Sequence, residues 1–182
     1  MTVAATADEP LRMELGSRLT AGAHRVALRQ DGTRHLPWAL ALTGSTSTPP
    51  IVAPGVGFFT AFNQQTTTLG GTLLLQISWR LAQDLQTPVA LIGIPAGLRP
   101  LRSALDELVA QGEIGAWELS GDLLVLYWVK LDDDIGQITV PCVAEVPGQF
   151  RGPASRLYGY YDRTRQAWSV PLRVTITAPP GW

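Results

Sequence analysis

The sequence has almost no cysteine. Cys142 is the only one among 182 residues, so the chain can form neither an internal disulfide nor a cysteine-based metal site. Its neighbours Val140, Pro141 and Val143 place it in an apolar, strand-like segment. A thiol there is either part of the core or a reactive group, and we expect the buried, structural thiol.

An excess of charge of one sign is also missing. The chain has 14 Lys and Arg against 15 Asp and Glu, for a net charge of −1. Nucleic acids and anionic membranes are bound by clustered Lys and Arg, so we expect no nucleic-acid partner. No apolar run approaches the roughly 18 residues that span a bilayer, which argues against membrane insertion. Residues 1–13 lack the basic start and apolar core of a signal peptide, so we expect no export signal in this chain.

The motifs of common catalytic sites are absent as well. His24 and His35 could be combined with Asp31 into a hydrolytic set, but no Gly-x-Ser-x-Gly or His-Glu-x-x-His motif accompanies them. The pairs Gly55/Gly57 and Gly70/Gly71 lack the further residues that a phosphate-binding loop needs. The sequence therefore predicts no enzyme, no catalytic residues and no cofactor.

One acidic run imitates a calcium-binding loop. Residues 132–134 are all Asp, and Ile135 and Gly136 follow. A calcium loop needs glycine at its sixth position and glutamate at its twelfth, and here those positions hold Gln137 and Val143. We interpret the run as a solvated hairpin turn and expect no metal site.

Short strand-like segments dominate the chain after residue 50. Eight of them are separated by turn signals: 57–62, 72–78, 88–94, 116–119, 123–131, 138–146, 156–161 and 167–176. The run 123–129 is apolar enough for a strand buried on both faces. The pattern predicts an all-β fold, an antiparallel β-sandwich with one short helix.

The helix is expected between two of these segments. Pro100 suits a first helical turn, where a missing N–H costs nothing, and Gly112 suits a left-handed end. The residues expected on its apolar face, packed across the sandwich, are Leu101, Leu105, Leu108 and Val109.

The chain divides near residue 50. Residues 44–50 form a linker rich in Ser, Thr and Pro, and two strand-like segments precede it at 19–28 and 36–42. Two or three strands are too few for an independent domain. We expect residues 1–10 to be disordered or a linker, 11–46 to be a partial β unit and 51–178 to be the complete sandwich.

Six tryptophans are compatible with sugar binding, since exposed aromatic rings can hold a pyranose. Core packing is the stronger interpretation for three of them, which lie inside strand patterns: Trp38, Trp117 and Trp128. The candidates for exposure are Trp79, Trp168 and Trp182.

Two further sets of residues are candidates for contact with a partner. Alternation along 156–161 places Tyr158 and Tyr160 on one face and Tyr161 on the other, and we expect at least one buried phenol with its hydroxyl bonded. Arg99 and Arg102 lie at the start of the expected helix. They are either solvated, with an Arg102 to Asp106 pair, or a docking patch for a partner's carboxylates.

A series of phrases resembles the C-terminal receptor-binding domain of the α-2-macroglobulin and complement family. In order, they are Ile94-Pro95-Ala96-Gly97-Leu98, the helix, Val125-Leu126-Tyr127-Trp128-Val129-Lys130, Gly152-Pro153-Ala154 and Leu157-Tyr158-Gly159-Tyr160-Tyr161-Asp162. The resemblance covers about residues 51–178, and residues 15–42 resemble the last strands of the preceding CUB-like domain. The single cysteine suits a bacterial-type member.

The resemblance implies a β-sandwich of the macroglobulin receptor-binding type, which is the C-terminal, non-catalytic interaction domain of a protease trap. The family's thioester lies in Gly-Cys-Gly-Glu-Gln, whereas Cys142 stands in Pro-Cys-Val. The thioester would therefore belong to another domain or chain, target proteases would be partners only indirectly, and the location would be extracellular or periplasmic.

Within that resemblance, either Tyr158 or Tyr160, but not both, would pack against the thioester domain and shield the reactive bond from water. Vertebrate members contact a receptor through two lysines four residues apart on the helix. Arg99 matches the first position, but Ser103 stands at the second, so the receptor contact does not carry over. The alternative is a free-standing carbohydrate- or protein-binding β-sandwich module.

Overall fold

Strands make up most of the described chain, and one helix interrupts them. The computed structural model describes Arg25, Ala27 and residues 55–131 and 135–178. The predictions for 1–10, 11–46 and the acidic run 132–134 lie outside these residues.

The elements are β1 (Val56–Phe62), β2 (Thr66–Thr68), β3 (Thr72–Leu81), β4 (Leu85–Gln86), β5 (Pro88–Gly93), β6 (Leu98–Pro100), α1 (Arg102–Ala110), β7 (Ala116–Ser120), β8 (Leu123–Tyr127), β9 (Lys130–Leu131), β10 (Ile135–Ala144), β11 (Gly148–Arg151), β12 (Ser155–Gly159), β13 (Gln166–Ser169) and β14 (Arg173–Thr177).

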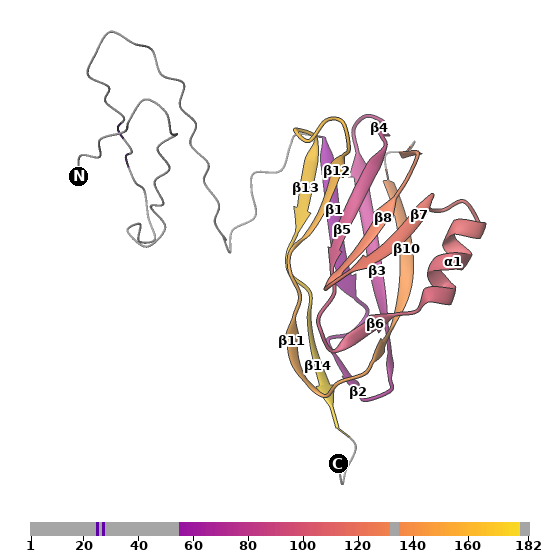
Figure 1. Cartoon of the computed structure of the whole chain (residues 1–182), viewed down its shortest axis with the longest axis vertical. Coiled ribbons are helices and arrows are strands. Elements are labelled where there is room, and N and C mark those ends of the chain that lie inside the picture. The colour runs from indigo at the N-terminus through magenta and orange to yellow at the C-terminus, as the bar shows by residue number, and fades with distance from the viewer. Residues whose placement is uncertain (1–24, 26, 28–54, 132–134, 179–182) are drawn as a thin grey trace, which may run out of the picture. The chain divides into compact units, whose positions relative to one another are not determined.

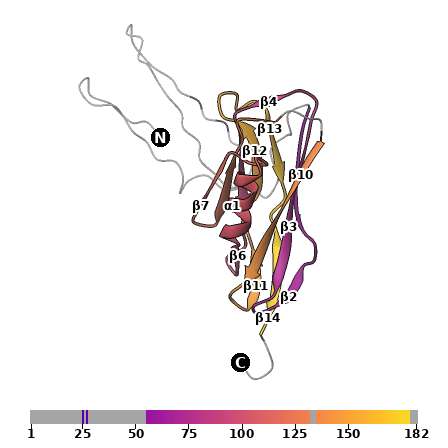
Figure 2. The same ribbon diagram turned by 90° about the vertical axis from the view of Figure 1, so that its right-hand side faces the viewer.

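Two antiparallel sheets form the layers of a sandwich (Figures 1 and 2). One has the strand order β1-β3-β10-β6 and the other β13-β12-β5-β8-β7. A smaller sheet, β11-β14-β2, contains the parallel pair β14 and β2, and β4 pairs with β9. The predicted antiparallel β-sandwich with one short helix is confirmed.

The core is built by alternation along the long strands. In β3, Leu73, Leu75 and Ile77 are fully buried while their neighbours Leu74 and Gln76 face outward. Such a period of two is what a strand with one face on a core shows. Most of the buried apolar residues of both sheets belong to this single cluster.

The helix differs from its prediction at its start and in one residue of its apolar face. Pro100 is the last residue of β6 and Leu101 is the N-cap, so Pro100 does not lie in the first helical turn. Gly112 has a φ of 77°, as expected for a left-handed end. Leu105 is fully buried, but Val109 is 36% exposed and does not belong to the apolar face.

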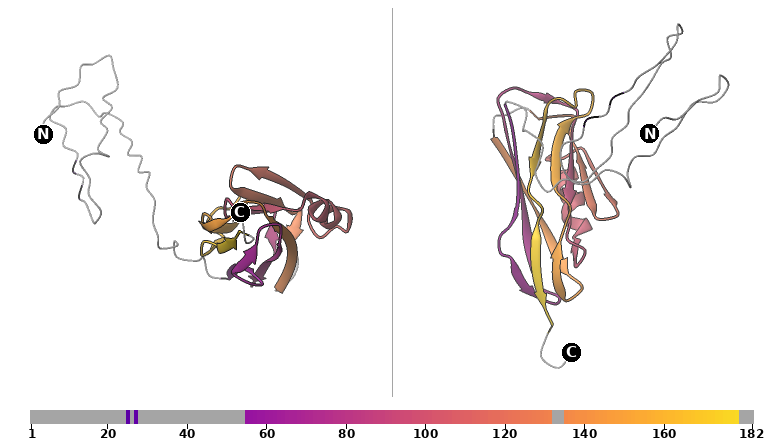
Figure 3. Two further views of the ribbon diagram at one scale, coloured as in Figure 1. Left: turned by 90° about the horizontal axis from the view of Figure 1, so that it is seen from below. Right: turned by 90° about the vertical axis from the view of Figure 1, so that its left-hand side faces the viewer.

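The helix lies beside the sandwich rather than across it (Figures 1 and 3). It contacts β10 of one sheet, and its Asp106 carboxylate accepts a hydrogen bond of 3.0 Å from Trp117 Nε1 of β7 in the other. Arg102 lies 6.0 Å above the centre of the Trp117 ring. The helix therefore closes the open side between the two layers.

Two predicted strands are each broken in two. The segment 123–131 becomes β8 and β9, because Trp128 turns inward while Val129 is 83% exposed between them. The segment 167–176 becomes β13 and β14, separated at Pro171, which cannot donate to a strand ladder. The expectation that 123–129 is buried on both faces holds only for the three central residues of β8.

Two glycines allow segments that are far apart in the sequence to pack closely against each other. A Cβ atom on Gly93 would lie 2.1 Å from the carbonyl oxygen of Pro153, and one on Gly97 would lie 2.4 Å from the Phe150 ring. No side chain fits at such separations. Residues 94–98 therefore contact residues that follow β10, far along the chain.

A buried hydroxyl network joins the two sheets. The Thr60 hydroxyl of β1 lies 3.0 Å from Ser169 Oγ of β13 and 3.4 Å from Ser155 Oγ of β12. The Thr60 backbone N–H donates to Ser169 Oγ, and the Gly93 N–H donates to Ser155 Oγ. All three hydroxyl side chains belong to buried residues, so their polar atoms depend on one another.

We expect Ser155→Ala to lower the free energy of unfolding by about 1–3 kcal/mol, because the Gly93 N–H would stay buried without an acceptor. Urea unfolding checks this as a lower midpoint with an unchanged slope. Ser120→Ala, at an exposed position of β7, is the control and should change stability by less than about 0.5 kcal/mol. Equal effects of the two variants would contradict the prediction.

The predicted structural thiol is also confirmed, since Cys142 is fully buried and burial raises its pKa to about 12. Because only the thiolate attacks a disulfide reagent, the folded protein should not react with such a reagent at pH 8, while the urea-unfolded chain should react. An unfolded thiol loses its proton above its ordinary pKa of 9.0, so this group should also reduce stability as the pH rises from 9 to 12. Fast labelling of the folded chain would show that the core opens.

Candidate functional site

The alternation of β12 decides which side chains face outward. Ser155, Leu157 and Gly159 are buried, so Arg156 and Tyr158 point away from the core. Both are partly buried even so, which shows that their neighbours cover them.

The partners of β12 bring further aromatic residues to this side. Tyr158 lies opposite Val89 of β5, and Val89 lies opposite Tyr127 of β8. Val89 is only 2% exposed although it lies outside the core cluster. Residues that pair across strands share a face, so the two tyrosines flank a buried valine on the outer surface.

Arg156 lies in a stack with two rings on the same surface. Its guanidinium carbon is 4.4 Å from the centre of the Tyr158 ring and 5.3 Å from that of Trp168, its cross-strand neighbour on β13. Arg156 Nε and Trp168 Nε1 are both buried and have no hydrogen-bond partner among the described residues. Burial lowers the pKa of Arg156, and the charge of Arg163 acts in the same direction. The guanidinium still keeps its charge at physiological pH.

Tyr127 completes this surface on its other side. Its hydroxyl donates a hydrogen bond of 2.9 Å to Glu118 Oε1 on the edge strand β7. That bond, above all, raises the pKa of Tyr127, and the nearby Tyr158 and Tyr160 phenols add to the effect. We call the outer surface formed by Tyr127, Arg156, Tyr158, Tyr160 and Trp168 the aromatic face.

Of the predicted tyrosines, Tyr158 and Tyr160 belong to this face, and none of the three is fully buried. Tyr160 is 51% exposed and Tyr161 is 85% exposed, and their rings contact edge to face at 5.1 Å. The expectation of a buried, hydrogen-bonded phenol is therefore wrong. The reason is that β12 ends at Gly159, so Tyr160 and Tyr161 lie in the turn beyond the paired strand.

The structure does not bring the predicted arginines to the aromatic face. Arg99 lies in β6, in the other sheet, and forms an ion pair with Glu145. Arg102 stacks on Trp117, and the expected pair with Asp106 does not form because Trp117 is the partner of that carboxylate. Arg99 and Arg102 therefore belong to different elements, and only Arg102 is in the helix.

All four tryptophans that the structure describes are at least partly buried. Trp128 is buried and contacts the Trp79 ring at 5.5 Å. Trp79 and Trp168 are partly buried, so their predicted exposure is wrong, and Trp117 is partly buried beneath the helix. Trp38 and Trp182 lie outside the described residues.

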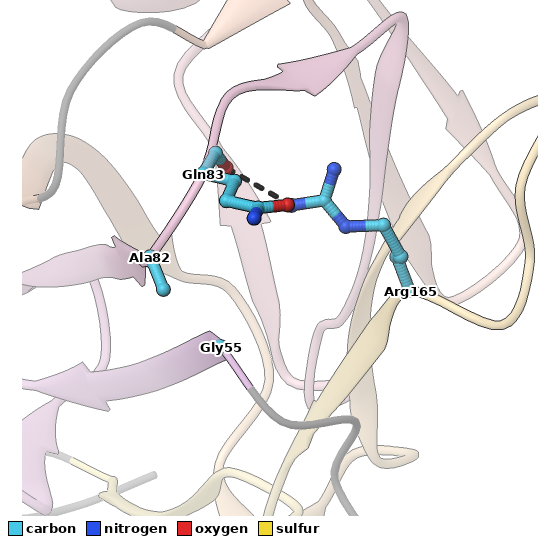
Figure 4. Close-up of a pocket in the computed structure, with 4 residues that line it drawn as sticks. All are labelled: Gly55, Ala82, Gln83 and Arg165. Atoms are coloured by element: carbon cyan, nitrogen blue, oxygen red, sulfur yellow. Dashed lines mark hydrogen bonds between the residues drawn. The ribbon is translucent and has the colours of Figure 1, made fainter.

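A pocket is lined by Gly55, Ala82, Gln83 and Arg165 (Figure 4). The Arg165 guanidinium donates to the backbone carbonyls of Asp84 at 2.8 Å and Gln83 at 3.0 Å. Its donors hold the β12–β13 connection against the loop after β3, so this arginine has a structural role.

The described residues also contain no cluster of His, Cys, Asp or Glu that could hold a metal ion. Within the same residues, no helix is both long enough and apolar enough to cross a membrane.

Arg156, Tyr127 and Glu118 were missed as site residues, and Trp168 was considered from the sequence only for sugar binding. Alternation with Tyr158 was a signal for Arg156, which lies two residues before it. The other three reach the face only through strand pairing, which the sequence does not display.

Solved structures share this fold, although no protein-family model and no curated protein matches the sequence. Native alpha-2-macroglobulin from Escherichia coli, from domain MG7 to the C-terminus, matches with a TM-score of 0.58 and 15% identity over 74% of this chain and 25% of that one. A Salmonella alpha-2-macroglobulin mutant matches with a TM-score of 0.59 and 14% identity over 73% and 10%. The E. coli protein activated by porcine elastase matches with a TM-score of 0.57 and 15% identity over 74% and 14%.

The chain thus spans a quarter or less of the length of these proteins. Its fold is the one found in the C-terminal region of bacterial alpha-2-macroglobulins, which confirms the fold that the sequence resemblance implied.

Glu118→Gln should lower the pKa of Tyr127 toward its ordinary value of 10.0, because the variant removes the carboxylate that holds the phenolic proton. A carbon NMR titration of the Tyr127 ring measures this directly. Glu107→Gln, at an exposed position of the helix, is the control. A Tyr127 pKa that does not respond to the Glu118 variant would show that the hydrogen bond is not formed in solution.

Proposed function

We propose that this chain is a non-catalytic interaction domain of an alpha-2-macroglobulin-like protease trap. In this proposal the aromatic face docks against a thioester-containing domain or chain of the same trap. The observation that carries it is the outer face of the five-stranded sheet, where Tyr127, Tyr158 and Tyr160 gather over buried Val89. The fold that this chain shares with part of a bacterial alpha-2-macroglobulin supports a multidomain trap as the assembly.

The chemistry of the face suits a protein partner. Tyrosine combines a large, rigid ring with a polar tip, so it can cover an apolar surface and still satisfy its hydroxyl at the rim. About half of the Tyr160 side chain is exposed and is available for burial in an interface. Docking of such rings excludes water, and exclusion of water is what an unreacted thioester needs.

The reactive group must belong to another segment. Cys142 is fully buried, and its raised pKa keeps it protonated and unreactive. The domain would therefore act through contacts, and target proteases would be partners of the assembled trap. An extracellular or periplasmic location follows from the same proposal.

The docking role of Arg99 and Arg102 is a second, smaller part of the proposal. Glu145 already neutralises Arg99, so this arginine offers little to a partner. Arg102 has no ion-pair partner among the described residues and stacks on Trp117 at an exposed position. We expect Arg102 to be the more important of the two cations.

A free-standing carbohydrate-binding module is less well supported. Sugar binding uses an aromatic ring with an open face. Trp79 and Trp168 are both partly buried, and Arg156 stacks on Trp168. Binding of a polysaccharide with quenching of tryptophan fluorescence would nevertheless favour it.

The test begins with the gene. We look for a reading frame that encodes Gly-Cys-Gly-Glu-Gln, either continuous with this one or adjacent to it. It is expressed together with this chain, and the complete protein or complex is purified. Of Tyr158→Ala and Tyr160→Ala, the variant that removes the contact should accelerate thioester loss to methylamine by about tenfold, which corresponds to about 1.4 kcal/mol of lost shielding. Mass spectrometry measures the incorporated methylamine over time.

Phe59→Ala is the matched control, because Phe59 is 57% exposed on β1 of the opposite sheet. It should leave the rate unchanged. Tyrosine variants that fold normally and react no faster than the parent would remove the shielding role.

A further inference from the structure

Arg156 differs from two other cations of the strands, Arg99 and Lys130. Arg99 is paired with Glu145, and Lys130 lies 3.0 Å from Asp84. Arg156 has no carboxylate within ion-pairing distance among the residues that the structure describes. Arg156 is also the most buried of these three cations, and its guanidinium lies close to the rings of Tyr158 and Trp168.

The nearest acidic residue in its row of the sheet is too far away. Arg156 lies opposite Leu91, Leu91 opposite Val125, and Val125 opposite Glu118. At about 4.8 Å per strand, Glu118 is on the order of 14 Å from Arg156. Its carboxylate also already accepts the hydrogen bond from Tyr127.

Two buried donors without acceptors lie side by side in this stack. Arg156 Nε and Trp168 Nε1 come from residues that pair directly across β12 and β13. A buried N–H without an acceptor costs about 1–3 kcal/mol. Most native buried polar groups are satisfied, so two exceptions in one cross-strand pair need an acceptor from water or from a partner.

We propose that the stack of Tyr158, Arg156 and Trp168 is a carboxylate-binding site, and that it receives an Asp or Glu side chain of the protein that docks on the aromatic face. The location rests on the proposed docking function, but the chemistry does not depend on which protein docks. A carboxylate has two acceptor oxygens that match the fork of guanidinium donors. The flanking rings hold the guanidinium in place and reduce its hydration, which strengthens the pair.

A single carboxylate fits better than a polyanion. The next cation, Arg163, is exposed in the turn between β12 and β13, and the other neighbours in the strand register are apolar or neutral: Leu91, Val89 and Gln166. Nucleic acid or a sulfated sugar would need several cations in a row. One partly desolvated charge in an apolar surround is instead the arrangement of an interface contact between proteins.

The experiment uses the full chain labelled with nitrogen-15 and observes the Arg156 Nε–H and Trp168 Nε1–H signals. The probe is the peptide acetyl-Gly-Glu-Phe-Glu-Gly-amide, and its comparison replaces both glutamates by glutamine. We expect saturable shifts of both signals with the glutamate peptide and at least tenfold weaker binding with the glutamine peptide. Equal binding of the two peptides, or no shift of either signal, would overturn the proposal.

Variants separate the site from general charge attraction. Arg156→Met should weaken binding of the glutamate peptide at least tenfold. Arg156→Lys, which keeps the charge and the long stem, should weaken it about fivefold because an ammonium cannot make the paired bonds. Arg151→Met is the control, since Arg151 is exposed on β11, and it should bind as the parent does. A lysine variant that binds as tightly as the parent would contradict a directed contact.

The two proposals can fail separately. Selective peptide binding together with tyrosine variants that do not affect methylamine incorporation would uphold the carboxylate site and remove the thioester-shielding role. Faster methylamine incorporation in the tyrosine variants without selective peptide binding would do the reverse.

Discussion

The buried hydroxyl of Ser155 is the contact on which the arrangement of this surface depends. It accepts from the Gly93 N–H and lies beside the Thr60 hydroxyl, so it ties β12 to its own sheet and to the opposite one. A hydroxyl with these partners cannot turn to solvent without leaving buried polar groups unpaired. Because side chains alternate along a strand, a slip of one residue would bury Arg156 and Tyr158 and expose Leu157. The register of one strand thus determines the composition of the aromatic face.

The same face carries Arg156, whose surroundings differ from those of Arg99 and Lys130. Arg99 and Lys130 are neutralised within the chain, and each is a partly exposed surface pair of small energetic value. Arg156 is instead held between two rings and separated from carboxylates, so that its charge stays available at a cost in desolvation. A surface of this kind is less stable alone than it is in an interface. The tyrosines of this face carry the docking proposal, and Arg156 carries the proposal of a carboxylate-binding site.

Much of the fold was predictable because alternation and turn residues are local. The strands near residues 57–62, 88–94 and 116–119 were placed within a few residues, and so was the left-handed end at Gly112. The errors in the strand ends have both a local and a tertiary cause. Pro171 divides an apparently continuous run, and the pairing of β12 ends at Gly159, which leaves Tyr160 and Tyr161 in a turn. The position of the helix beside the sandwich was not predictable either, since its amphipathic pattern does not say which surface it covers.

The sequence by itself determined that this chain is an all-β sandwich with one helix and that its cysteine is buried. These features depend on residue type and on spacings of two or a few residues, which hold whatever the rest of the chain does. Only the tertiary structure decided that Trp168 meets Arg156, that Tyr127 joins the tyrosines, and that Arg99 is neutralised by Glu145. Each of these contacts joins residues that are distant along the chain, and their proximity comes from strand pairing, which is selected by burial of the whole core rather than by any local pattern.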